Sequence, residues 1–578
     1  MQGRLVQFPS GGNPVQPAPR NAGQGAPAQP ATDATRQAIV SPSRREDLLL
    51  FLVTVVPGLA LAIRATMQLH LYHSDNLARA YAAGQVIHGF EPKLTNLGFA
   101  WPQIPAMLQL PFAALVPSLI YQGVAGPIVS VLACSGCVLL LNRILDPYIP
   151  RRWVRFSVLL LFLANPLVLY LTLSGTAEMI YLAFILLSWW SFQRIWSQTP
   201  PPLTQVSVMG IAVSCAFLSR YEGAVYGVIL GATLALMIYL RLSPHGRSIT
   251  EGLMVIYLLP LMYVTVLLLI FNWIIVGNPL YFAVGQGSQS EVAANLISTQ
   301  EALQALVGDP LAAARYVLQV SWYVFPLLFL VVPLAIARAI KKRDIVLAGL
   351  VFLALSTPLV QWYQHVSGQL AGYVRYYVSN VVFGLLLLIY ATQPLALQGR
   401  RVLNASRELA LVLVLAVGTM LPWIDLHNPS IRWDNLSSQD LEVILGLAPA
   451  DAASRGAQER AISDYFSRTL FAREHDARVL VDDSEANAII LFSGELNHFV
   501  VPNTIRYPEI VADPVGTVDY ILVPDLPPDQ DLILEQYPGL FHDGAPFATL
   551  VKEFSGGPWT SVGGTEWTKW RLYRVSGE

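Results

Sequence analysis

Charged side chains are scarce in this sequence. Only 13% of its 578 residues are Asp, Glu, Lys or Arg, whereas 54% are hydrophobic, and the formal net charge is −2. Soluble globular domains carry about 25% charged residues, so most of this chain is expected to lie in lipid. The near-neutral balance, without a basic patch to neutralise phosphates, excludes nucleic acid as an evident partner.

Cysteine is also scarce. The three cysteines are Cys134, Cys137 and Cys215, and the first two form a C-x-x-C motif. That motif can serve redox or metal chemistry, but here it lies inside an apolar run, and no second ligand pair accompanies it. Small residues are favoured where membrane helices touch, so we expect these cysteines to pack helices together.

Motifs that identify common enzyme classes are missing. No segment has the H-E-x-x-H pattern of zinc proteases, and His73, His88 and His365 match no ligand spacing. The polar C-terminal part contains no G-x-G-x-x-G, P-loop or G-x-S-x-G sequence. No cofactor is therefore predicted and no metal site is assigned, while a requirement for a divalent metal stays open.

The N-terminal segment has few large apolar side chains. Residues 1–43 are rich in Pro, Gly, Gln and Ala and cannot bury enough surface to offset the entropy of ordering, so we predict that they are disordered. The first apolar run starts near Leu48, too late for an ordinary signal peptide, and should be a retained anchor. Arg44 and Arg45 precede it and place the N-terminus in the cytoplasm by the positive-inside rule.

Long apolar runs dominate residues 44–424, which we predict to form a transmembrane module. A helix needs about 20 residues to cross the hydrocarbon core. About eleven runs approach that length, near 48–67, 123–142, 155–173, 177–194, 205–219, 223–240, 252–276, 312–338, 345–363, 374–392 and 405–424. Another block, 103–119, is interrupted by several prolines and could either cross or lie at the interface.

The basic residues decide between these two options. If 103–119 does not cross, every basic cluster faces the cytoplasm, as the positive-inside rule expects; if it crosses, they all face outside. The clusters are Arg143 with Arg151, Arg152 and Arg155; Arg194; Arg241 with Arg247; Arg338 with Lys341, Lys342 and Arg343; and Arg400, Arg401 and Arg407. The sequence therefore predicts a mainly α, polytopic bundle of about eleven spans, with juxtamembrane helices in the first outer loop.

A polar region follows Trp423. Residues 425–578 contain no further apolar span and lie on the extracytoplasmic side by the count of spans. Alternating strand and helix signals predict a small α/β domain with a partly parallel sheet. The expected strands lie in 477–483, 487–494, 497–501, 518–525 and 570–575, and a helical segment is expected at 453–470.

The first outer loop, residues 73–101, contains the most distinctive candidate. Asp75 comes just after the first apolar run, where a carboxylate can act as a general base toward an acceptor hydroxyl. It could equally be a solvated acid or a helix N-cap, because Ser74 precedes it and a helix-like segment follows. Arg79, four residues on, shares a helix face with Asp75 and could form a local ion pair with it.

Arg220 and Arg375 stand on the predicted outer face, against the usual bias of basic residues. Guanidinium groups bind phosphate through paired hydrogen bonds, so both are candidates for an anionic lipid headgroup; interfacial snorkelling is the alternative. The remaining candidates for substrate binding on this face are Arg79, Glu178, Tyr221, Glu222 and His365. The two glutamates could balance the arginines or orient sugar hydroxyls.

This order of features resembles the GT-C superfamily of integral membrane glycosyltransferases, which includes protein mannosyltransferases and aminoarabinose transferases. The resemblance covers roughly 45–424. Asp75 takes the place of the family's catalytic first-loop acid, and LGFAWPQIPAMLQLPF is similar to its proline-rich juxtamembrane segment. SGTAEMIYLAF, LSRYEGAV and GYVRYYVSN resemble the segments that supply a second acid and two arginines, matching Glu178, Arg220 and Arg375. One departure is Asn76, because the family commonly has an Asp-Glu pair.

The resemblance implies sugar transfer from a polyprenyl-phosphate donor to an acceptor hydroxyl on the extracytoplasmic face, with inversion. Asp75 would be the base, and Arg220 and Arg375 would hold the phosphate. The acceptor could be a glycan, a lipid or a protein, and membrane lipid would surround the bundle. A transporter or flippase of a lipid-linked saccharide is the alternative, although it predicts paired half-repeats that the sequence lacks. A glycan polymerase or ligase of another fold would place its main functional loop later in the chain.

Overall fold

The computed structural model describes residues 44–198, 200–241, 246–285, 288–393, 401–428, 438–449, 456–554 and 569–576. Every helix and strand named below belongs to the compact unit Ser41–Glu578. The prediction of disorder for residues 1–43 lies outside the described residues.

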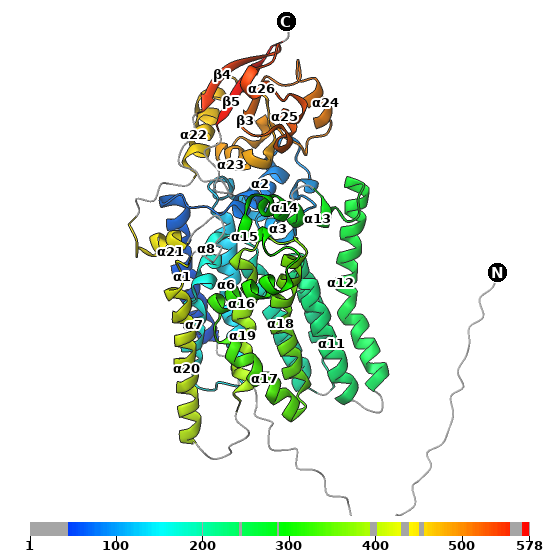
Figure 1. Ribbon diagram of the computed structural model, residues 1–578, viewed down its shortest axis with the longest axis vertical. Coiled ribbons are helices and arrows are strands. Elements are labelled where there is room, and N and C mark those ends of the chain that lie inside the picture. The colour runs from blue at the N-terminus through cyan, green and yellow to red at the C-terminus, as the bar shows by residue number, and fades with distance from the viewer. Residues whose placement is uncertain are drawn as a thin grey trace, which may run out of the picture. The chain divides into compact units, whose positions relative to one another are not determined.

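Seven helical stretches of the described chain are long and apolar enough to cross a membrane (Figure 1). They are α1 (Arg44–Ile63) with η1 (Arg64–Gln68), α6 (Ala125–Leu145), α11 (Gly223–Arg241), α12 (Gly246–Val276), α18 (Ile345–Val366), η3 (Val374–Tyr377) with α19 (Ser379–Ala391), and α20 (Arg401–Ile424). Two bent pairs raise the number to nine if each pair is one span. These pairs are α7 (Arg152–Leu163) with α8 (Pro166–Ser174), at 66°, and α16 (Pro310–Val324) with α17 (Leu328–Lys342), at 100°.

The two remaining predicted spans are also helices. α9 (Glu178–Ser197) has 20 residues and α10 (Leu203–Phe217) has 15, but neither is among the helices that satisfy both length and apolarity. α9 lies inside the bundle, where Trp189 is fully buried, and Cys134 and Cys137 of α6 are fully buried as expected for packing residues. The prediction of a mainly helical membrane bundle is confirmed, whereas helix length and composition do not establish eleven spans.

Prolines divide the 103–119 block into short helices. These are α3 (Ile104–Met107), α4 (Leu110–Leu115) and α5 (Pro117–Tyr121), each with a proline in its first turn. Proline is tolerated there because the first N–H groups of a helix have no partner within the helix. The longest of the three has six residues, far too few to cross a hydrocarbon core of about 30 Å. They pack instead against α2 (Ser74–His88), which opens the predicted outer loop.

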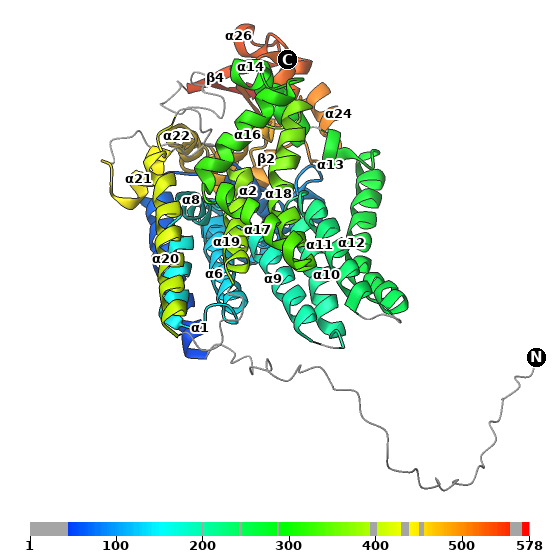
Figure 2. The same ribbon diagram turned by 60° about the horizontal axis from the view of Figure 1, so that its bottom comes forward.

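The periphery of the bundle is uneven. Figures 1 and 2 both place α12 at one edge and α20 at another. Only 17% of the most apolar part of α12 is buried, so most of its surface is left for lipid. Short helices complete the connections: η2 (Leu94–Leu97), α13 (Tyr281–Val284), α14 (Gln289–Thr299), α15 (Glu301–Gln304) and α21 (Ser438–Leu445).

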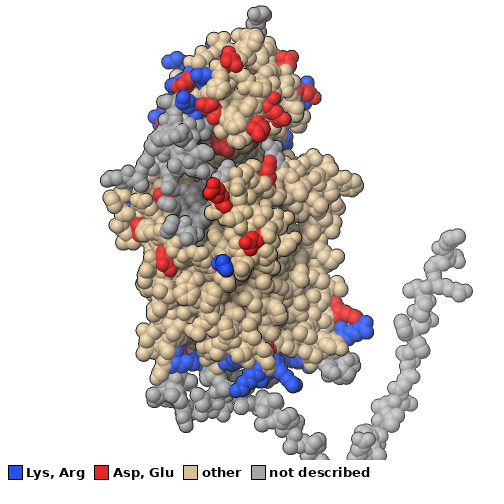
Figure 3. Space-filling view, viewed as in Figure 1, with Lys and Arg blue, Asp and Glu red and all other residues tan. Residues whose placement is uncertain are grey.

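Basic residues gather at one end of the bundle. Figure 3 shows Lys and Arg at the end opposite the sheet domain, beyond a broad band with few charged residues. Arg143, Arg194, Arg241, Lys341 and Lys342 lie in the last turns of α6, α9, α11 and α17, and Arg151 and Arg152 begin α7. The predicted basic clusters in these turns therefore share one face, which is the sidedness that the charge count required.

Arg155 joins three helices at this basic end. Its side chain is 2% exposed, and its guanidinium contacts Glu46 of α1 at 2.6 Å and Asp146, just after α6, at 2.7 Å. The Arg155 Nε–H also donates to Asn142 Oδ1 at 2.7 Å. Buried charges are tolerated only when they are paired, so this cluster fixes where α1, α6 and α7 meet.

The C-terminal sheet domain contains five strands in the order β2-β1-β3-β5-β4. The strands are β1 (Val479–Leu480), β2 (Phe499–Val500), β3 (Tyr520–Pro524), β4 (Ala548–Phe554) and β5 (Trp570–Val575). β1 pairs in parallel with β2 and β3, whereas β5 pairs antiparallel with β3 and β4. Its helices are α22 (Ala457–Tyr465), η4 (Phe466–Leu470), α23 (Asp483–Ser493), η5 (Leu496–His498), α24 (Tyr507–Ala512), η6 (Pro528–Gln530), α25 (Leu532–Gln536) and α26 (Leu540–Asp543).

One prediction for this domain was wrong, and one strand was missed. Residues 487–494 belong to helix α23 rather than to a strand, because Asp482 caps the helix by accepting a hydrogen bond from the Ser484 N–H, and Gly494 ends it in the left-handed conformation. A short apolar run cannot by itself distinguish a buried strand from a buried helix. The edge strand β4 was not predicted, since most of its residues are exposed on both faces.

The Arg155 cluster predicts a large effect on stability. Replacing Arg155 with Ala leaves Glu46 buried and without its nearest cation, and loss of one partner of a buried ion pair costs about 3–5 kcal/mol. We expect a clear fall in the melting temperature of the detergent-solubilised protein. Arg152→Ala is the matched control, because Arg152 also faces Glu46, at 3.5 Å, but its side chain is 66% exposed. Equal losses in the two variants would contradict this assignment.

Candidate active site

Asp75 lies in the first turn of α2, but its carboxylate does not cap that helix. The N-cap of α2 is His73, whose Nδ1 accepts a hydrogen bond from the Asp75 backbone N–H at 3.1 Å. Since His73 caps the helix, the Asp75 carboxylate is available for other partners. The alternative of Asp75 as the helix N-cap is therefore wrong.

Two guanidinium groups hold the Asp75 carboxylate. Its Oδ2 lies 2.7 Å from Nη1 of Arg375 and 3.1 Å from Nη2 of Arg79. The Arg79 contact is the local i,i+4 pair expected from the sequence, whereas Arg375 lies 300 residues further along the chain. The Arg375 side chain is only 5% exposed, so its charge depends on protein partners.

Glu178 connects Arg375 to Arg220. Glu178 opens α9, its side chain is 1% exposed, and its Oε1 accepts a hydrogen bond from Arg220 Nη1. The same Oε1 lies 3.9 Å from Arg375 Nε. Arg220 Nη2 also donates to Glu222 Oε1 at 2.7 Å. Three carboxylates and three guanidinium groups therefore alternate in a row with no net charge. We call it the ion-pair cluster: Glu222, Arg220, Glu178, Arg375, Asp75 and Arg79.

Tyr376 packs between the two arginines. The Arg220 guanidinium carbon lies 4.9 Å from the centre of the Tyr376 ring, and that of Arg375 lies 5.4 Å from it. Arg375 also lies 5.3 Å from the ring centre of Tyr373. Cations are attracted to aromatic faces at these distances, so both tyrosines orient the arginines. In the sequence alone, tyrosines at such positions are indistinguishable from an interfacial aromatic belt.

The cluster controls the proton affinity of Asp75. Burial alone would raise its pKa, but the charges of Arg375 and Arg79, with a smaller contribution from His73, outweigh burial and hold the pKa well below its ordinary value. Asp75 is therefore ionised at neutral pH, and it is a weak base while it is paired with Arg375.

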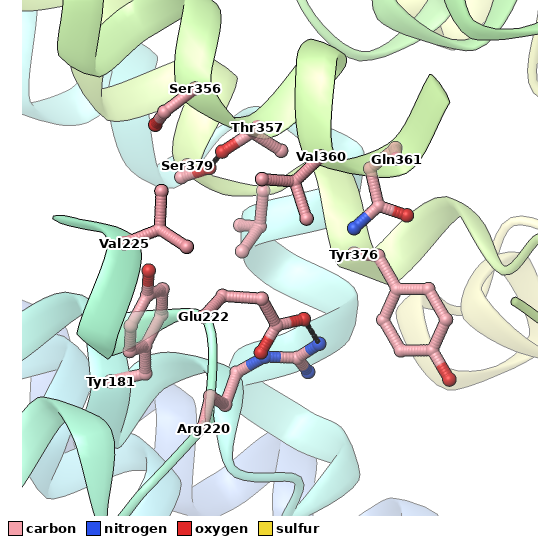
Figure 4. A pocket seen from close by; sticks show the side chains of 11 residues that line it. Tyr181, Arg220, Glu222, Val225, Ser356, Thr357, Val360, Gln361, Tyr376 and Ser379 are labelled. Atoms are coloured by element: carbon pink, nitrogen blue, oxygen red, sulfur yellow. Dashed lines mark hydrogen bonds and ion pairs between the residues drawn. The ribbon is translucent and has the colours of Figure 1, made fainter. Parts of the chain in front are cut away.

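A pocket lies beside Arg220 (Figure 4) and contains about 390 Å³ of non-atom space, open solvent included. Arg220 and Glu222 form one wall, and α18 supplies the opposite one. The other lining residues are Tyr181, Val225, Ser356, Thr357, Val360, Gln361, Tyr376, Val378 and Ser379.

Gln361 lines this pocket with a buried polar group that has an unpaired atom. Its side chain lies in the C-terminal half of α18, is 1% exposed, and its Oε1 has no hydrogen-bond partner. Thr357 and Ser379 satisfy each other by a hydrogen bond of 2.6 Å between their hydroxyls. Polar side chains within membrane spans are expensive and usually functional. That signal was present in the sequence and could have singled out Gln361.

Two sequence candidates lie beside the cluster rather than in it. The Tyr221 hydroxyl donates to the Ala100 carbonyl at 3.3 Å, and its ring packs 5.1 Å from that of Phe282. The His365 ring packs edge-on against Tyr316 at 4.9 Å. Tyr221 therefore joins the first outer loop to the 281–284 helix, and His365 supports the segment before Arg375.

Asn76 explains the departure from an Asp-Glu pair. Its side chain is 1% exposed, and its Nδ2 donates to the Gly123 carbonyl at 2.8 Å. A Cβ atom on Gly126 would lie 1.9 Å from Asn76 Oδ1, and one on Gly175 would lie 2.7 Å away. Asn76 thus fits a tight, uncharged space under α2, where a longer acidic side chain would meet backbone.

The described residues contain no group of three His, Cys, Asp or Glu side chains arranged to hold a metal ion.

The fold of this chain is similar to that of a solved structure. ArnT from Cupriavidus metallidurans bound to undecaprenyl phosphate superposes with a TM-score of 0.52 at 10% sequence identity, over 92% of this chain and 98% of that one. The chain shares the fold of ArnT. The same ArnT in its apo state gives a TM-score of 0.47 at 12% identity, over 91% and 97% of the two chains. The apo oligosaccharyltransferase of Archaeoglobus fulgidus gives 0.43 at 10% identity, over 82% and 69%.

No protein-family model matches the sequence, and no curated protein matches it. The likeness to ArnT is therefore one of fold, and it agrees with the fold expected from the resemblance based on the order of short motifs.

The low pKa of Asp75 predicts a pH-dependent contribution to stability. Its folded pKa lies below the unfolded value of about 3.9, so its stabilising effect is complete above that value and is lost as pH falls toward the folded pKa. We expect a constant difference in melting temperature between wild type and Asp75→Asn above about pH 5, and a shrinking difference below about pH 4. Asp309→Asn, at an exposed helix cap outside the cluster, controls for general acid effects. A difference that stays constant down to about pH 3 would contradict the assignment.

Proposed function

We propose that this chain is a membrane glycosyltransferase that transfers a sugar from a polyprenyl-phosphate donor to an acceptor hydroxyl. The ion-pair cluster is the observation that carries this proposal, because it combines fixed cations that can bind a phosphate with a carboxylate that can take the acceptor's proton. The direct contact of Arg375 with Asp75, at 2.7 Å, brings the two functions together. The GT-C fold, and the undecaprenyl phosphate bound to ArnT, support the same class of donor.

The cluster is proposed to face the extracytoplasmic side. It lies at the end of the bundle that contacts the sheet domain through α2, and the basic turns lie at the other end (Figure 3). The positive-inside rule assigns such basic turns to the cytoplasm. Donor, acceptor and the sheet domain would then meet outside the cytoplasm, with the N-terminus inside.

The pocket beside Arg220 supports a place for the donor. Arg220 and Arg375 would hold the phosphate, with Tyr376 keeping both guanidinium groups in position. The pocket extends from Arg220 along α18, where Val225, Val360 and Val378 supply apolar lining. The first part of the lipid chain would follow this lining toward the bilayer, which leaves the sugar on the side of Asp75.

The proposed reaction is a single displacement. The acceptor oxygen attacks the anomeric carbon and forms the new C–O bond, and its proton passes to Asp75. The bond between the anomeric carbon and the phosphate oxygen breaks, and the phosphate leaves with the electron pair, so the configuration inverts. The phosphate gains one negative charge as it leaves, and Arg220 and Arg375 neutralise that charge without an acid.

Donor binding would also activate the base. Paired with both Arg375 and Arg79, Asp75 is a weak base. A donor phosphate competes with Asp75 for Arg375, and loss of that cation raises the proton affinity of the carboxylate. Phosphate binding and acceptor activation would therefore be coupled through one side chain, Arg375.

Asp75→Asn separates binding from chemistry. We expect transfer to fall by about 10²–10⁴-fold, the usual contribution of a general base, while donor binding is retained or tightened because Arg375 loses a competing anion. The assay is purified protein in detergent with polyprenyl-phosphate sugars, read as covalent product by mass and as donor affinity by calorimetry. A transporter would yield no covalent product in detergent, where there is no second compartment.

Asp309→Asn, at an exposed cap outside the cluster, is the matched control for this experiment and should transfer normally. Wild-type turnover by Asp75→Asn would eliminate Asp75 as the base. Weakened donor binding in that variant would argue against the competition for Arg375.

Gln361→Leu tests the donor pocket. A hydrogen bond from the Gln361 side-chain N–H to the charged phosphate would contribute about 1.5–3 kcal/mol, so loss of the amide should raise the donor KM about tenfold or more with little change in kcat. Gln364→Leu is the control, one turn further along α18 and outside the pocket lining. Equal effects of the two substitutions, or a change in kcat alone, would exclude the pocket as the donor site.

A further inference from the structure

The helix that carries Asp75 is held by the sheet domain on both sides of that residue. Tyr72, three residues before Asp75, receives a hydrogen bond from Arg460 of α22. The Arg460 guanidinium also lies 5.2 Å from the Tyr72 ring centre and 4.6 Å from that of Phe492. Tyr72 is 2% exposed, and its hydroxyl in turn donates to the Thr66 carbonyl at 2.8 Å. The chain entering α2 is thus joined to the sheet domain.

The second contact lies six residues beyond Asp75. The Tyr81 hydroxyl donates to Oδ2 of Asp483 at 2.7 Å. Asp483 is the first residue of α23, and Tyr81 is 7% exposed. Burial raises the pKa of Asp483 to about 6 and that of Tyr81 far above its ordinary value. At neutral pH the contact is therefore a phenol donating to a carboxylate, which is one of the stronger kinds of hydrogen bond.

Apolar packing brings α2 unusually close to the sheet domain. A Cβ atom on Gly84 would lie 2.8 Å from Leu496 Cδ2. Leu77 and Ala80 of α2 share one buried core with Ile490 of α23. Such packing supplies stability but is non-directional, so it does not by itself fix the rotation of α2 about its axis.

Directional contacts at Tyr81 and Tyr72 can fix that rotation. Tyr81 lies six residues after Asp75, which is about 240° around a helix of 3.6 residues per turn. The sheet domain therefore holds one face of α2, while another face directs Asp75 toward Arg375 in the bundle. A small rotation of α2 would move the carboxylate away from Arg375, since their contact is only 2.7 Å long.

We propose that Tyr81 with Asp483, and Tyr72 with Arg460, are positioning residues through which the sheet domain sets the orientation of Asp75. This proposal rests on the proposed function, in which Asp75 is the base. It assigns a role to the sheet domain: that domain holds the catalytic helix in register with the arginines, across the boundary between two parts of the chain.

Tyr81→Phe and Asp483→Leu test this role, because each removes the contact with little change in shape. We expect each to lower kcat about tenfold at unchanged donor KM, and the double variant to be no slower than either single one, since both remove the same bond. The rate of backbone hydrogen exchange should rise in peptides from α2 and stay unchanged in peptides from the sheet domain. Glu553→Gln, which removes an exposed carboxylate from β4 in the same domain, should behave as wild type.

The outcomes separate the two proposals. Wild-type kcat in Tyr81→Phe and Asp483→Leu, or additive losses in the double variant, would overturn the positioning role. A fall in melting temperature together with faster exchange throughout the domain would also overturn it in favour of a purely structural contact. If wild-type protein transfers no sugar from any donor, the proposed function fails, and hydrogen exchange in α2 alone then decides whether the domain holds this helix.

Discussion

The ion pair between Arg375 and Asp75 is the contact on which the rest of this structure depends. Arg375 is 5% exposed, and a guanidinium in such a place is stable only with a fixed anion beside it. Asp75 supplies one anion and Glu178 the next, so three segments far apart in the chain must come together before the charges are satisfied. The packing at this end of the bundle therefore depends on supplying anions to the buried Arg375.

The other elements can be understood as supports for that contact. The short proline-started helices leave room at this end of the bundle because none of them is long enough to cross a membrane, and α2 lies against them. η3 and α19 carry Arg375 on the most deeply buried span, with 94% of its apolar stretch inside the structure. Tyr376 then packs against both arginines. A rigid surrounding is what a preorganised electrostatic site requires, since charges that must reorganise during reaction stabilise a transition state less.

The sequence predicted that the site residues share one face of the bundle, and it predicted the local pair of Arg79 with Asp75, but not the long-range pairings. Asp75, Glu178, Arg220 and Arg375 could be assigned to one face because that assignment needs only the order of apolar runs and the basic residues between them. The pairing of Asp75 with Arg375 depends on how distant spans pack, which no local pattern records. Tyr376 was indistinguishable from an ordinary interfacial tyrosine for the same reason.

Local ambiguity accounts for the errors in the sheet domain. AIILF reads equally as a buried strand or a buried helix, and the cap at Asp482 decided for the helix. β4 lacks the alternation that marks a half-buried strand, because it is an edge strand exposed on both faces. Helix length alone does not fix the number of spans. α10 is shorter than a full span, and each bent pair reaches the length of a span only when its two helices are counted together.

The fit of Asn76 against Gly126 and Gly175 has an evolutionary consequence. A side chain on either glycine would collide with the Asn76 carboxamide, so position 76 cannot drift independently of the other two. In relatives of this chain, a larger residue at 126 or 175 should appear together with a smaller one at 76, and the three positions should covary. The catalytic candidate at 75 would stay unchanged through such exchanges, because its side chain faces the arginines and not the glycines.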